Sequence, residues 1–271
     1  MTRKVNFGSV AHDYAKWRND LPDTLFTKLS NRGIEVNGSN IADLGAGTGV
    51  LTRGLSKQGA NVIAIEPSKD LTDLGGKIDT KEGVSITYFN RTAENTALPG
   101  NRYDYVTVLR AWHWFDREKA LQEVRRILKE DGTFLVMDSG FLPKQSLLIR
   151  NTLRVIKKHM PHQKMTSPGS KSGSTQLINS FPVEWFEEWK ENSFELTDCF
   201  KFSYEVSFTP CEWKGRVGSL SWLSMFERSK RERVLQEVQD NVTETFGSTI
   251  HAVPHEFYVS ILKKNKQATV E

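Results

Sequence analysis

The 271-residue sequence predicts an α/β fold, in which a mainly parallel sheet is covered by helices on both faces. The first observation is that short apolar stretches alternate with segments of helical periodicity through the first half of the chain. The second is a glycine-rich turn that joins one of these stretches to a helix. Because parallel strands need crossover connections, the repeated strand–helix–strand order predicts parallel pairing.

The first half contains five candidate strands and three candidate helices. The helix after the glycine-rich turn carries Val50, Leu51 and Leu55 at helical spacing. The third helix, at about 117–129, has Asp116 as its N-cap and ends at Asp131-Gly132. The strands are expected at about 40–44, 61–66, 84–89, 103–109 and 132–138, and a short second helix at about 69–74.

The second half changes character, because helices dominate it and only two further strands are expected. Residues 163–176 are rich in Ser, Gly, Lys and Pro, which predicts a mobile loop. Strands at about 194–208 and 256–262 are expected to pair as an antiparallel hairpin at the sheet edge. Helices are expected at about 143–160, 183–190, 212–226 and 230–246.

The composition limits the classes of partner. The formal net charge is +4 and the pI is about 8.9, which is only mildly basic and does not indicate a nucleic-acid partner. No stretch approaches the roughly 18 apolar residues needed to cross a bilayer, and the first residues lack the apolar segment of a signal peptide. Cys199 and Cys211 give neither a disulfide framework nor zinc spacing. We therefore expect a cytoplasmic protein with no metal or membrane partner, as a monomer or homodimer.

The glycine-rich turn has the sequence pattern of a nucleotide-cofactor site. The run 41–49 leads from an apolar strand into glycines and then a helix, and the stretch 62–66 forms a second apolar strand that ends in Glu66. Glycines let the backbone approach a ligand, and a helix start offers unpaired N–H groups. A carboxylate at the end of the second strand can accept hydrogen bonds from both ribose hydroxyls.

The glycine spacing separates two kinds of cofactor. A dinucleotide fingerprint needs a third glycine where this chain has Val50. Here Gly45, Gly47 and Gly49 alternate, and Asp43 lies two positions before the first of them. This D-x-G-x-G-x-G pattern resembles motif I of the class I S-adenosylmethionine-dependent methyltransferases, with Glu66 at the matching distance.

Four further segments carry the same resemblance, to the UbiE and trans-aconitate methyltransferase-like (methyltransferase type 11) family. The run Glu123–Lys129 resembles the family's E-x-x-R-V-L-K segment, although Glu130-Asp131-Gly132 stands where Pro-Gly-Gly is usual. The other matching segments are 7–18, 92–99 and 103–116, the last containing the AxHWxD-like run from Ala111 to Asp116. The resemblance implies a Rossmann-like seven-stranded, mostly parallel sheet with the last strand antiparallel.

The resemblance also implies S-adenosylmethionine as the cofactor and S-adenosylhomocysteine as the product. Arg18 would pair with the methionine carboxylate, because a guanidinium matches a carboxylate, and Tyr14 lies one helical turn away on the same face. The backbone of Ala93 and the side chain of Glu94 would lie beside the adenine. The full set of implied cofactor-binding residues is Tyr14, Arg18, Asp43, Gly45, Ala46, Gly47, Thr48, Glu66, Pro67, Ala93, Glu94, Arg110 and Ala111.

Structural alternatives stay open for several of these residues. Asp43 would cap local backbone N–H groups instead, Glu66 would be an exposed strand-end carboxylate, and Glu94 would stabilise a short helix. Tyr14 would pack in the core.

His113 is the candidate general base, since its ordinary pKa lies near neutrality. The alternative is that it only packs or orients, because methyl transfer often needs no base. Asp116 is interpreted as a helix cap rather than a catalyst.

The expected organisation is a single domain, 1–271, with a core at about 30–140 and 194–264. Residues 1–29 would form a cap, and about 141–190 and 210–246 a helical lid over the acceptor site. Six of the seven tryptophans, in the AxHWxD-like run or the second half, line an aromatic acceptor cavity or fill core. The predicted activity is in-line transfer of the sulfonium methyl to a small-molecule acceptor. A non-catalytic S-adenosylmethionine-binding protein, a methyltransferase acting on RNA or protein, and a nicotinamide-dependent oxidoreductase are the alternatives.

Overall fold

The computed structural model describes residues 21–160, 165, 169–220, 223 and 226–265, and divides the chain into two compact units. The sheet unit comprises Leu21–Asp138, Gly169–Lys201 and the described residues from Tyr258 to Asn265. The helical unit comprises the described residues of Ser139–Pro168 and Phe202–Phe257. Of the two segments of the predicted core, about 30–140 falls almost wholly in the sheet unit, whereas most of the described residues of 194–264 fall in the helical unit.

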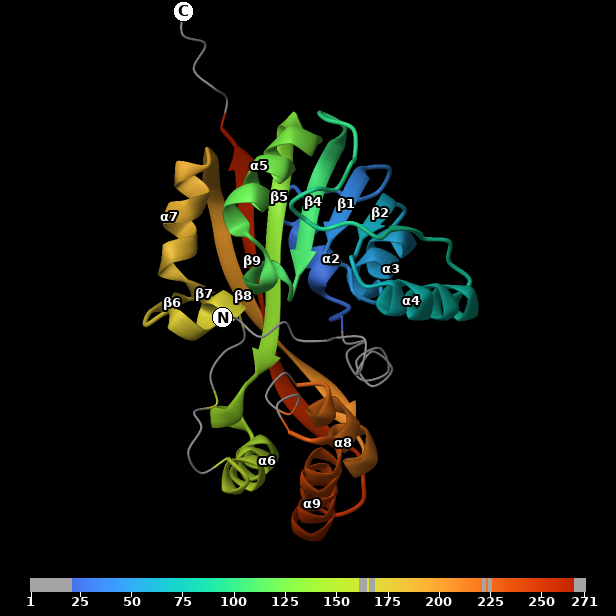
Figure 1. Ribbon diagram of the computed structural model, residues 1–271, viewed down its shortest axis with the longest axis vertical. Helices are drawn as coiled ribbons and strands as arrows, with labels where there is room; N and C mark the ends of the chain where they lie inside the picture. Colours follow the sequence, from blue (N-terminus) through green and yellow to red (C-terminus); the bar gives the residue numbers. More distant parts are fainter. Residues whose placement is uncertain (1–20, 161–164, 166–168, 221–222, 224–225, 266–271) are drawn as a thin grey trace, which may run out of the picture. The chain divides into compact units, whose positions relative to one another are not determined.

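The main sheet has seven strands in the order β3-β2-β1-β4-β5-β9-β8 (Figure 1). Strands β3, β2, β1, β4 and β5 are parallel neighbours, and β9 runs opposite to β5 and β8. The predicted fold, including the antiparallel hairpin at the edge, is therefore confirmed. The strands are β1 Asn40–Leu44, β2 Asn61–Ile65, β3 Thr87–Phe89, β4 Tyr103–Leu109, β5 Leu128–Phe141, β8 Phe194–Phe208 and β9 His251–Lys264.

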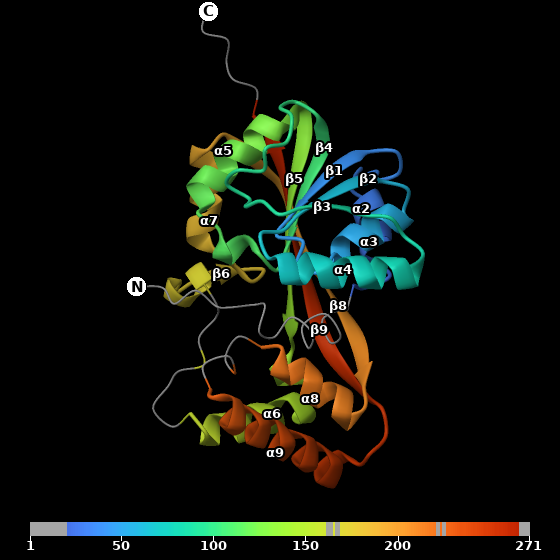
Figure 2. The same ribbon diagram turned by 45° about the vertical axis from the view of Figure 1, so that its right-hand side comes forward.

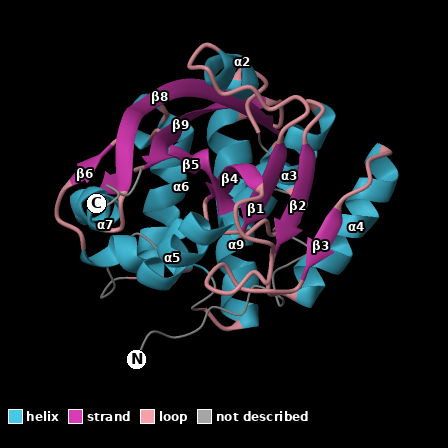
Figure 3. Ribbon diagram, turned by 90° about the horizontal axis from the view of Figure 1, so that it is seen from above, coloured by secondary structure: helices cyan, strands magenta, loops and turns pink. Residues whose placement is uncertain are grey.

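Helices cover both faces of the sheet in the sheet unit. Figures 2 and 3 show α5 and α7 on one face and α2 and α3 on the other. Alternation along the strands explains this division, because Ala42 and Leu44 of β1 pack in the core cluster that contains α5 and α7, while Asp43 points to the opposite face. The helices are α2 Leu25–Ser30, α3 Val50–Lys57, α4 Lys69–Glu82, α5 Arg117–Ile127 and α7 Val183–Glu191, with 3₁₀ turns at Trp112–Trp114 and Gly169–Gly173.

Helix α4 is longer than the sequence predicts. The predicted helix stops at Leu74, before Gly75-Gly76, but α4 continues to Glu82. Gly75 does not end the helix; it allows close packing, since a Cβ there would lie 2.7 Å from the Tyr88 hydroxyl and 3.1 Å from the Thr48 carbonyl oxygen. The glycine is explained by a contact between elements rather than by local helix propensity.

Part of the segment predicted to be a loop is ordered structure. Residues 169–173 form a 3₁₀ turn, and β6 Leu177–Ile178 pairs antiparallel with β7 Phe181–Pro182. Helix α7 follows directly, and its Trp185 and Trp189 are buried with Phe181 in the core cluster of the sheet unit. These tryptophans fill core, as the alternative to a cavity lining proposed.

The helical unit is built around α6 Leu147–Lys158, α8 Pro210–Gly218 and α9 Arg228–Phe246. Trp213 of α8 is buried among Phe141 and Phe208, and its indole N–H donates to the Thr152 hydroxyl of α6 at 2.8 Å. Helix α8 starts in a capping box made by Thr209 and Glu212. Among the residues that the structure describes, no helix is both long and apolar enough to cross a membrane.

Candidate functional site

The loop after β1 is shaped by three left-handed glycines. Gly45, Gly47 and Gly49 have φ of +65°, +59° and +81°, a region that other residues adopt at a cost. The Gly45 N–H donates to the Ile65 carbonyl at 2.8 Å, which ties the loop to the end of β2. A Cβ on Gly45 would lie 2.6 Å from the Cβ of Ala111, so the loops after β1 and β4 meet there.

Glu66, at the end of β2, binds the glycine loop directly. Its Oε2 accepts from the Gly47 N–H at 3.0 Å and its Oε1 from the Ser68 N–H at 2.9 Å. The residue is only 7% exposed, so the alternative of an exposed strand-end carboxylate is wrong. Burial raises the pKa of Glu66 above its ordinary value, and the two backbone donors partly offset this rise. The carboxylate is thereby fixed at the carboxyl edge of the sheet, beside the loop, next to Pro67.

Asp43 lies one layer beneath the loop. Its Oδ2 accepts from the Thr52 hydroxyl of α3 at 2.6 Å and its Oδ1 from the Thr107 hydroxyl of β4 at 2.9 Å. Thr107 is its register partner on the neighbouring strand. Burial raises the pKa of Asp43 to about 6, against the lowering effect of both hydroxyls. Asp43 therefore connects β1 to α3 and β4, and a contact to the cofactor stays a prediction.

The turn predicted to lie beside an adenine is attached to α5. The backbone forms a narrow bridge between Thr92 and Asn95, and Ala93 within it is buried. Glu94 Oε1 accepts from the Asp116 N–H at 2.9 Å, at the start of α5. The Glu94 carboxylate thus stabilises the end of a helix, which agrees with the alternative weighed for it, although the helix is α5 rather than one of its own turn.

The segment after β4 carries the remaining predicted residues. Arg110 has a left-handed backbone, with φ of +58°, and its N–H donates to the Met137 carbonyl at 2.9 Å. Three residues on, His113 is buried in a 3₁₀ turn, its ring 4.8 Å from that of Trp114. The Ser170 hydroxyl donates to the His113 carbonyl at 3.3 Å, so the 169–173 turn contacts this segment.

Two further predictions have different outcomes. Asp116 is the N-cap of α5, and its side chain accepts from the Lys119 N–H, which confirms the helix-cap interpretation. Tyr14 and Arg18 lie outside the described residues, and their roles stay predictions.

Three polar residues of the site were not predicted from the sequence. Besides Thr52 and Thr107, Asn90 follows β3 and donates from Nδ2 to the Glu66 carbonyl and to the Thr72 hydroxyl, both at 3.1 Å. Only Thr107 could have been found from the sequence, because it is a polar residue between two valines in a predicted apolar strand. The contacts of Asn90 join segments 18 and 24 residues apart, which no local pattern encodes.

The assembled site places a buried carboxylate beside a glycine-rich loop at one sheet edge, where ligands of open α/β sheets bind. The described residues contain no group of three or more His, Cys, Asp or Glu side chains that would bind a metal ion. The geometry fits an organic ligand with hydroxyl donors rather than a phosphate, because the loop presents a carboxylate to it.

Comparisons with known proteins agree with this site. Residues 42–136 match the family model described as a methyltransferase domain, which spans the glycine loop, Glu66 and His113. An uncharacterized methyltransferase of Schizosaccharomyces pombe is 32% identical over 232 residues, covering 83% of this chain and 84% of that protein. A Dictyostelium discoideum protein that carries the name methyltransferase is 26% identical over 249 residues, covering 90% of this chain and 87% of its own length.

The fold is also shared with solved structures. One from Anaeromyxobacter dehalogenans, titled as a type II methyltransferase, has a TM-score of 0.60 at 19% identity, covering 90% of this chain and 96% of that one. This likeness shows the fold alone, whereas the sequence match to the Schizosaccharomyces protein extends over most of both chains. With the glycine loop and the strand order, these matches show that the chain belongs to the class I S-adenosylmethionine-dependent methyltransferases.

Proposed function

We propose that this methyltransferase binds S-adenosylmethionine at the 45–49 loop and transfers its methyl group to a small-molecule acceptor. The observation that carries the proposal is the buried Glu66 carboxylate bonded to the Gly47 N–H. A carboxylate has about four acceptor positions, and the two backbone N–H groups use two of them. The two left are available to a pair of ribose hydroxyls.

The loop supports an adenosyl sulfur compound over a dinucleotide. Its alternating glycines carry no Cβ atoms, and Val50 takes the place of the third glycine that a dinucleotide site needs for helix–strand packing. Ala93, buried in the 92–95 turn, supplies the proposed adenine contact through its backbone. These features argue against the nicotinamide alternative.

When bound, the cofactor supplies an electrophilic methyl group on a sulfonium, and the protein's task is to bind and orient. Orientation of two reacting groups near contact contributes roughly 7–11 kcal/mol, so an anionic acceptor needs no base. For an acceptor that must lose a proton, His113 is the proposed base, because a neutral imidazole accepts a proton near pH 7.

The acceptor class is inferred from the charge of the chain. The net charge of +4 is spread over 37 basic and 33 acidic residues, which favours a small molecule over a nucleic acid. A protein acceptor and a non-catalytic S-adenosylmethionine-binding role are the competing outcomes, and the experiments below distinguish them.

The test of the cofactor is calorimetric titration of the full chain with S-adenosylmethionine, S-adenosylhomocysteine and NAD. We expect micromolar binding of the two sulfur compounds and none of NAD, with affinity strongly reduced in Glu66→Ala. Glu130→Ala is the matched control, since Glu130 is an exposed carboxylate paired with Lys264. Absence of binding by either sulfur compound would contradict the proposal.

The test of catalysis is release of S-adenosylhomocysteine in the presence of a panel of small-molecule acceptors, with an RNA and a protein extract as rival acceptors. Turnover with a small molecule supports the proposal. Turnover only with RNA or protein would replace the acceptor class, and binding without any turnover would favour the regulatory alternative.

A further inference from the structure

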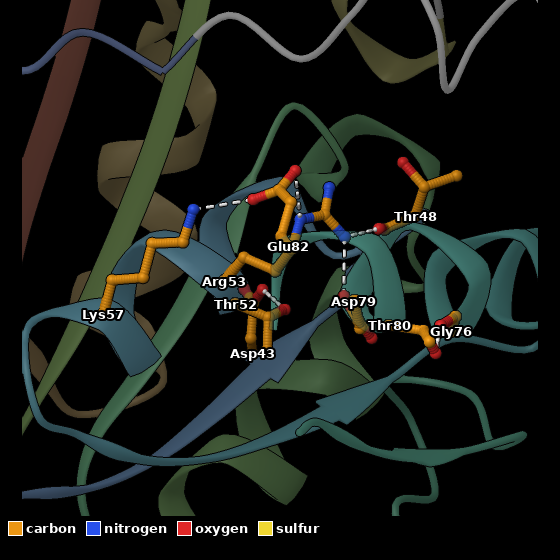
Figure 4. Close-up of polar contacts among 9 residues, drawn as sticks. All are labelled: Asp43, Thr48, Thr52, Arg53, Lys57, Gly76, Asp79, Thr80 and Glu82. Carbon is orange, nitrogen blue, oxygen red and sulfur yellow. Dashed lines mark hydrogen bonds and ion pairs between the residues drawn. The ribbon is translucent and has the colours of Figure 1, made fainter. Parts of the chain in front are cut away.

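A buried arginine lies directly behind the glycine loop and has no part in the site described above. Arg53 belongs to α3, one turn after the N-cap Gly49, and is only 3% exposed. Its Nη1 donates to the Thr48 carbonyl oxygen at 2.5 Å and to Asp79 Oδ1 of α4 at 3.0 Å (Figure 4). One guanidinium nitrogen therefore joins the loop backbone to a second helix.

The contact determines the orientation of one peptide group in the loop. The Thr48 carbonyl points to Arg53, and on the other side of the same peptide bond the Gly49 N–H donates to the Ala46 carbonyl at 2.9 Å. Since the peptide unit is planar, fixing both its ends fixes its rotation. This peptide joins Thr48 to Gly49, the N-cap of α3, so its orientation sets the path of the backbone from the loop into the helix.

The surrounding residues leave room for this contact. A Cβ at Gly49 would collide with the Tyr88 hydroxyl and lie 3.1 Å from Arg53 Nη1, and a Cβ at Gly75 would lie 3.1 Å from the Thr48 carbonyl oxygen. Two glycines on different elements thus clear the space in which Arg53 reaches the loop. Burial and the nearby Asp79 carboxylate raise the pKa of Tyr88, so its hydroxyl stays neutral beside this cluster.

The charged side chains between α3 and α4 form a cluster in which positive and negative charges are equal in number. Arg53 faces Asp79, and its Nε lies 3.7 Å from Glu82 Oε1, while Lys57 pairs with the other oxygen of Glu82 at 2.6 Å. Two cations therefore meet two carboxylates, and only the Arg53–Asp79 pair is deeply buried. Lys57 is half exposed and binds Glu82.

We propose that Arg53 is a positioning residue, which with Asp79 as its counter-ion sets the orientation of the Thr48–Gly49 peptide for cofactor binding. It acts through the loop and does not touch the cofactor. An arginine suits this task because its planar fork donates to a carbonyl and a carboxylate at the same time, which a lysine does with less geometric definition. This inference rests on the proposed cofactor site.

The experiment compares three variants of the full chain by calorimetric titration with S-adenosylhomocysteine and by thermal unfolding without ligand. In Arg53→Met/Asp79→Leu both buried charges are replaced by apolar side chains, which preserves packing without stranding a charge. We expect a thermal midpoint near that of the wild type and an affinity weaker by at least about tenfold, the size of a lost charge-assisted hydrogen bond. Lys57→Met, the matched α3–α4 control, should change neither.

Arg53→Lys keeps the fold testable if the double variant does not fold. The lysine retains the positive charge opposite Asp79 but loses the planar guanidinium group. We expect this variant to bind S-adenosylhomocysteine several-fold more weakly than the wild type does. Hydrogen exchange of residues 45–55 without ligand should be faster in this variant than in Lys57→Met, because the Gly49 N–H loses its fixed partner geometry.

Wild-type affinity in a folded Arg53 variant would overturn the inference while leaving the proposed function intact. Absence of S-adenosylhomocysteine binding by the wild type would instead overturn the proposed function, and the inference with it. The two failures are therefore distinguishable in one set of titrations.

Discussion

The glycine loop region and the helical unit are stabilised by different kinds of contact. Around residues 45–49, defined hydrogen bonds connect loop backbone groups to the Ile65 carbonyl, to Glu66 and to Arg53. In the helical unit, α6, α8 and α9 share an apolar cluster, into which Trp213 is packed with its indole N–H bonded to the Thr152 hydroxyl. The first region specifies orientation through directional bonds, whereas the second obtains stability from area removed from water.

The largest effect that tests this contrast is expected in the apolar cluster. Trp213→Ala should lower the free energy of unfolding by about 3–5 kcal/mol, because it leaves a cavity and removes the indole donor to the Thr152 hydroxyl oxygen. Urea denaturation followed by circular dichroism measures the change. Trp213→Phe is the control, and it should retain much of the stability by filling most of the volume. A loss below about 1 kcal/mol in Trp213→Ala would show that the cluster collapses around the gap.

The next effect concerns pH and the polar region. Asp43 has a raised pKa in the folded state, so its contribution to stability is fully present below the unfolded pKa of 3.8 and is lost as pH rises through about 6. A rise from 3.8 to about 6 corresponds to about 3 kcal/mol. Asp43→Asn cannot titrate at this position and should not show this loss. The free energy of unfolding of the variant, minus that of the wild type, should therefore rise by about 3 kcal/mol between pH 4 and pH 7, as measured by chemical denaturation.

The comparison must be made as a difference between wild type and variant. Other carboxylates titrate in the same range, and those with lowered pKa, such as Asp104 and Glu123, change stability in the opposite direction. A constant difference between Asp43→Asn and the wild type from pH 4 to pH 7 would mean that Asp43 titrates normally.

A smaller effect on stability, but a specific one on binding, is expected in the loop. Gly45→Ala adds a methyl 2.6 Å from the Ala111 Cβ and forces a left-handed alanine, at a cost of about 1–3 kcal/mol. Because strain and displacement arise in the loop itself, the free energy of S-adenosylhomocysteine binding should weaken by more than the free energy of unfolding falls. Gly33→Ala is the matched control, a left-handed glycine with open space around it, and should lose stability only.

The smallest effect lies at the start of α8. Thr209→Ala removes one side of the capping box, and the free energy of unfolding should fall by about 1 kcal/mol. Thr209→Ser keeps the hydroxyl and should behave as the wild type. If both variants lost equal stability, the hydroxyl would not be the source of the effect.

The sequence predicted the loop more fully than its surroundings. Glycines at alternate positions, a preceding strand and a terminal carboxylate lie within 26 residues, from Ile41 to Glu66, so a local pattern encodes them. The parallel pairing of the first five strands followed from the alternation of strands and helices in the first half of the chain. Arg53, Asn90 and Thr107 were missed because each acts on a partner brought near only by the fold, as Thr107 does on Asp43 from 64 residues away.

The errors in element length have the same origin. Gly75 has a low helix propensity, and a local interpretation ends the helix before it, but packing against Tyr88 and Thr48 favours a residue without a side chain there. Aromatic residues such as Trp185 and Trp189 are typical both of ligand cavities and of hydrophobic cores, and amino-acid composition alone does not distinguish these environments. In the structure both side chains lie in the core. Tyr14 and Arg18 lie outside the described residues, and their predicted roles come from the family resemblance.

The two backbone bonds to Glu66 also have a thermodynamic consequence for a ligand. A glutamate on a surface samples many rotamers, and fixing one on binding costs entropy, whereas here the Gly47 and Ser68 N–H groups restrict the side chain in the unliganded chain. The Glu66 side chain is therefore ordered when the chain folds, and a ligand does not have to order it on binding. The ribose of the proposed cofactor would then exchange water for a carboxylate already in place, and more of the interaction energy would be expressed as affinity.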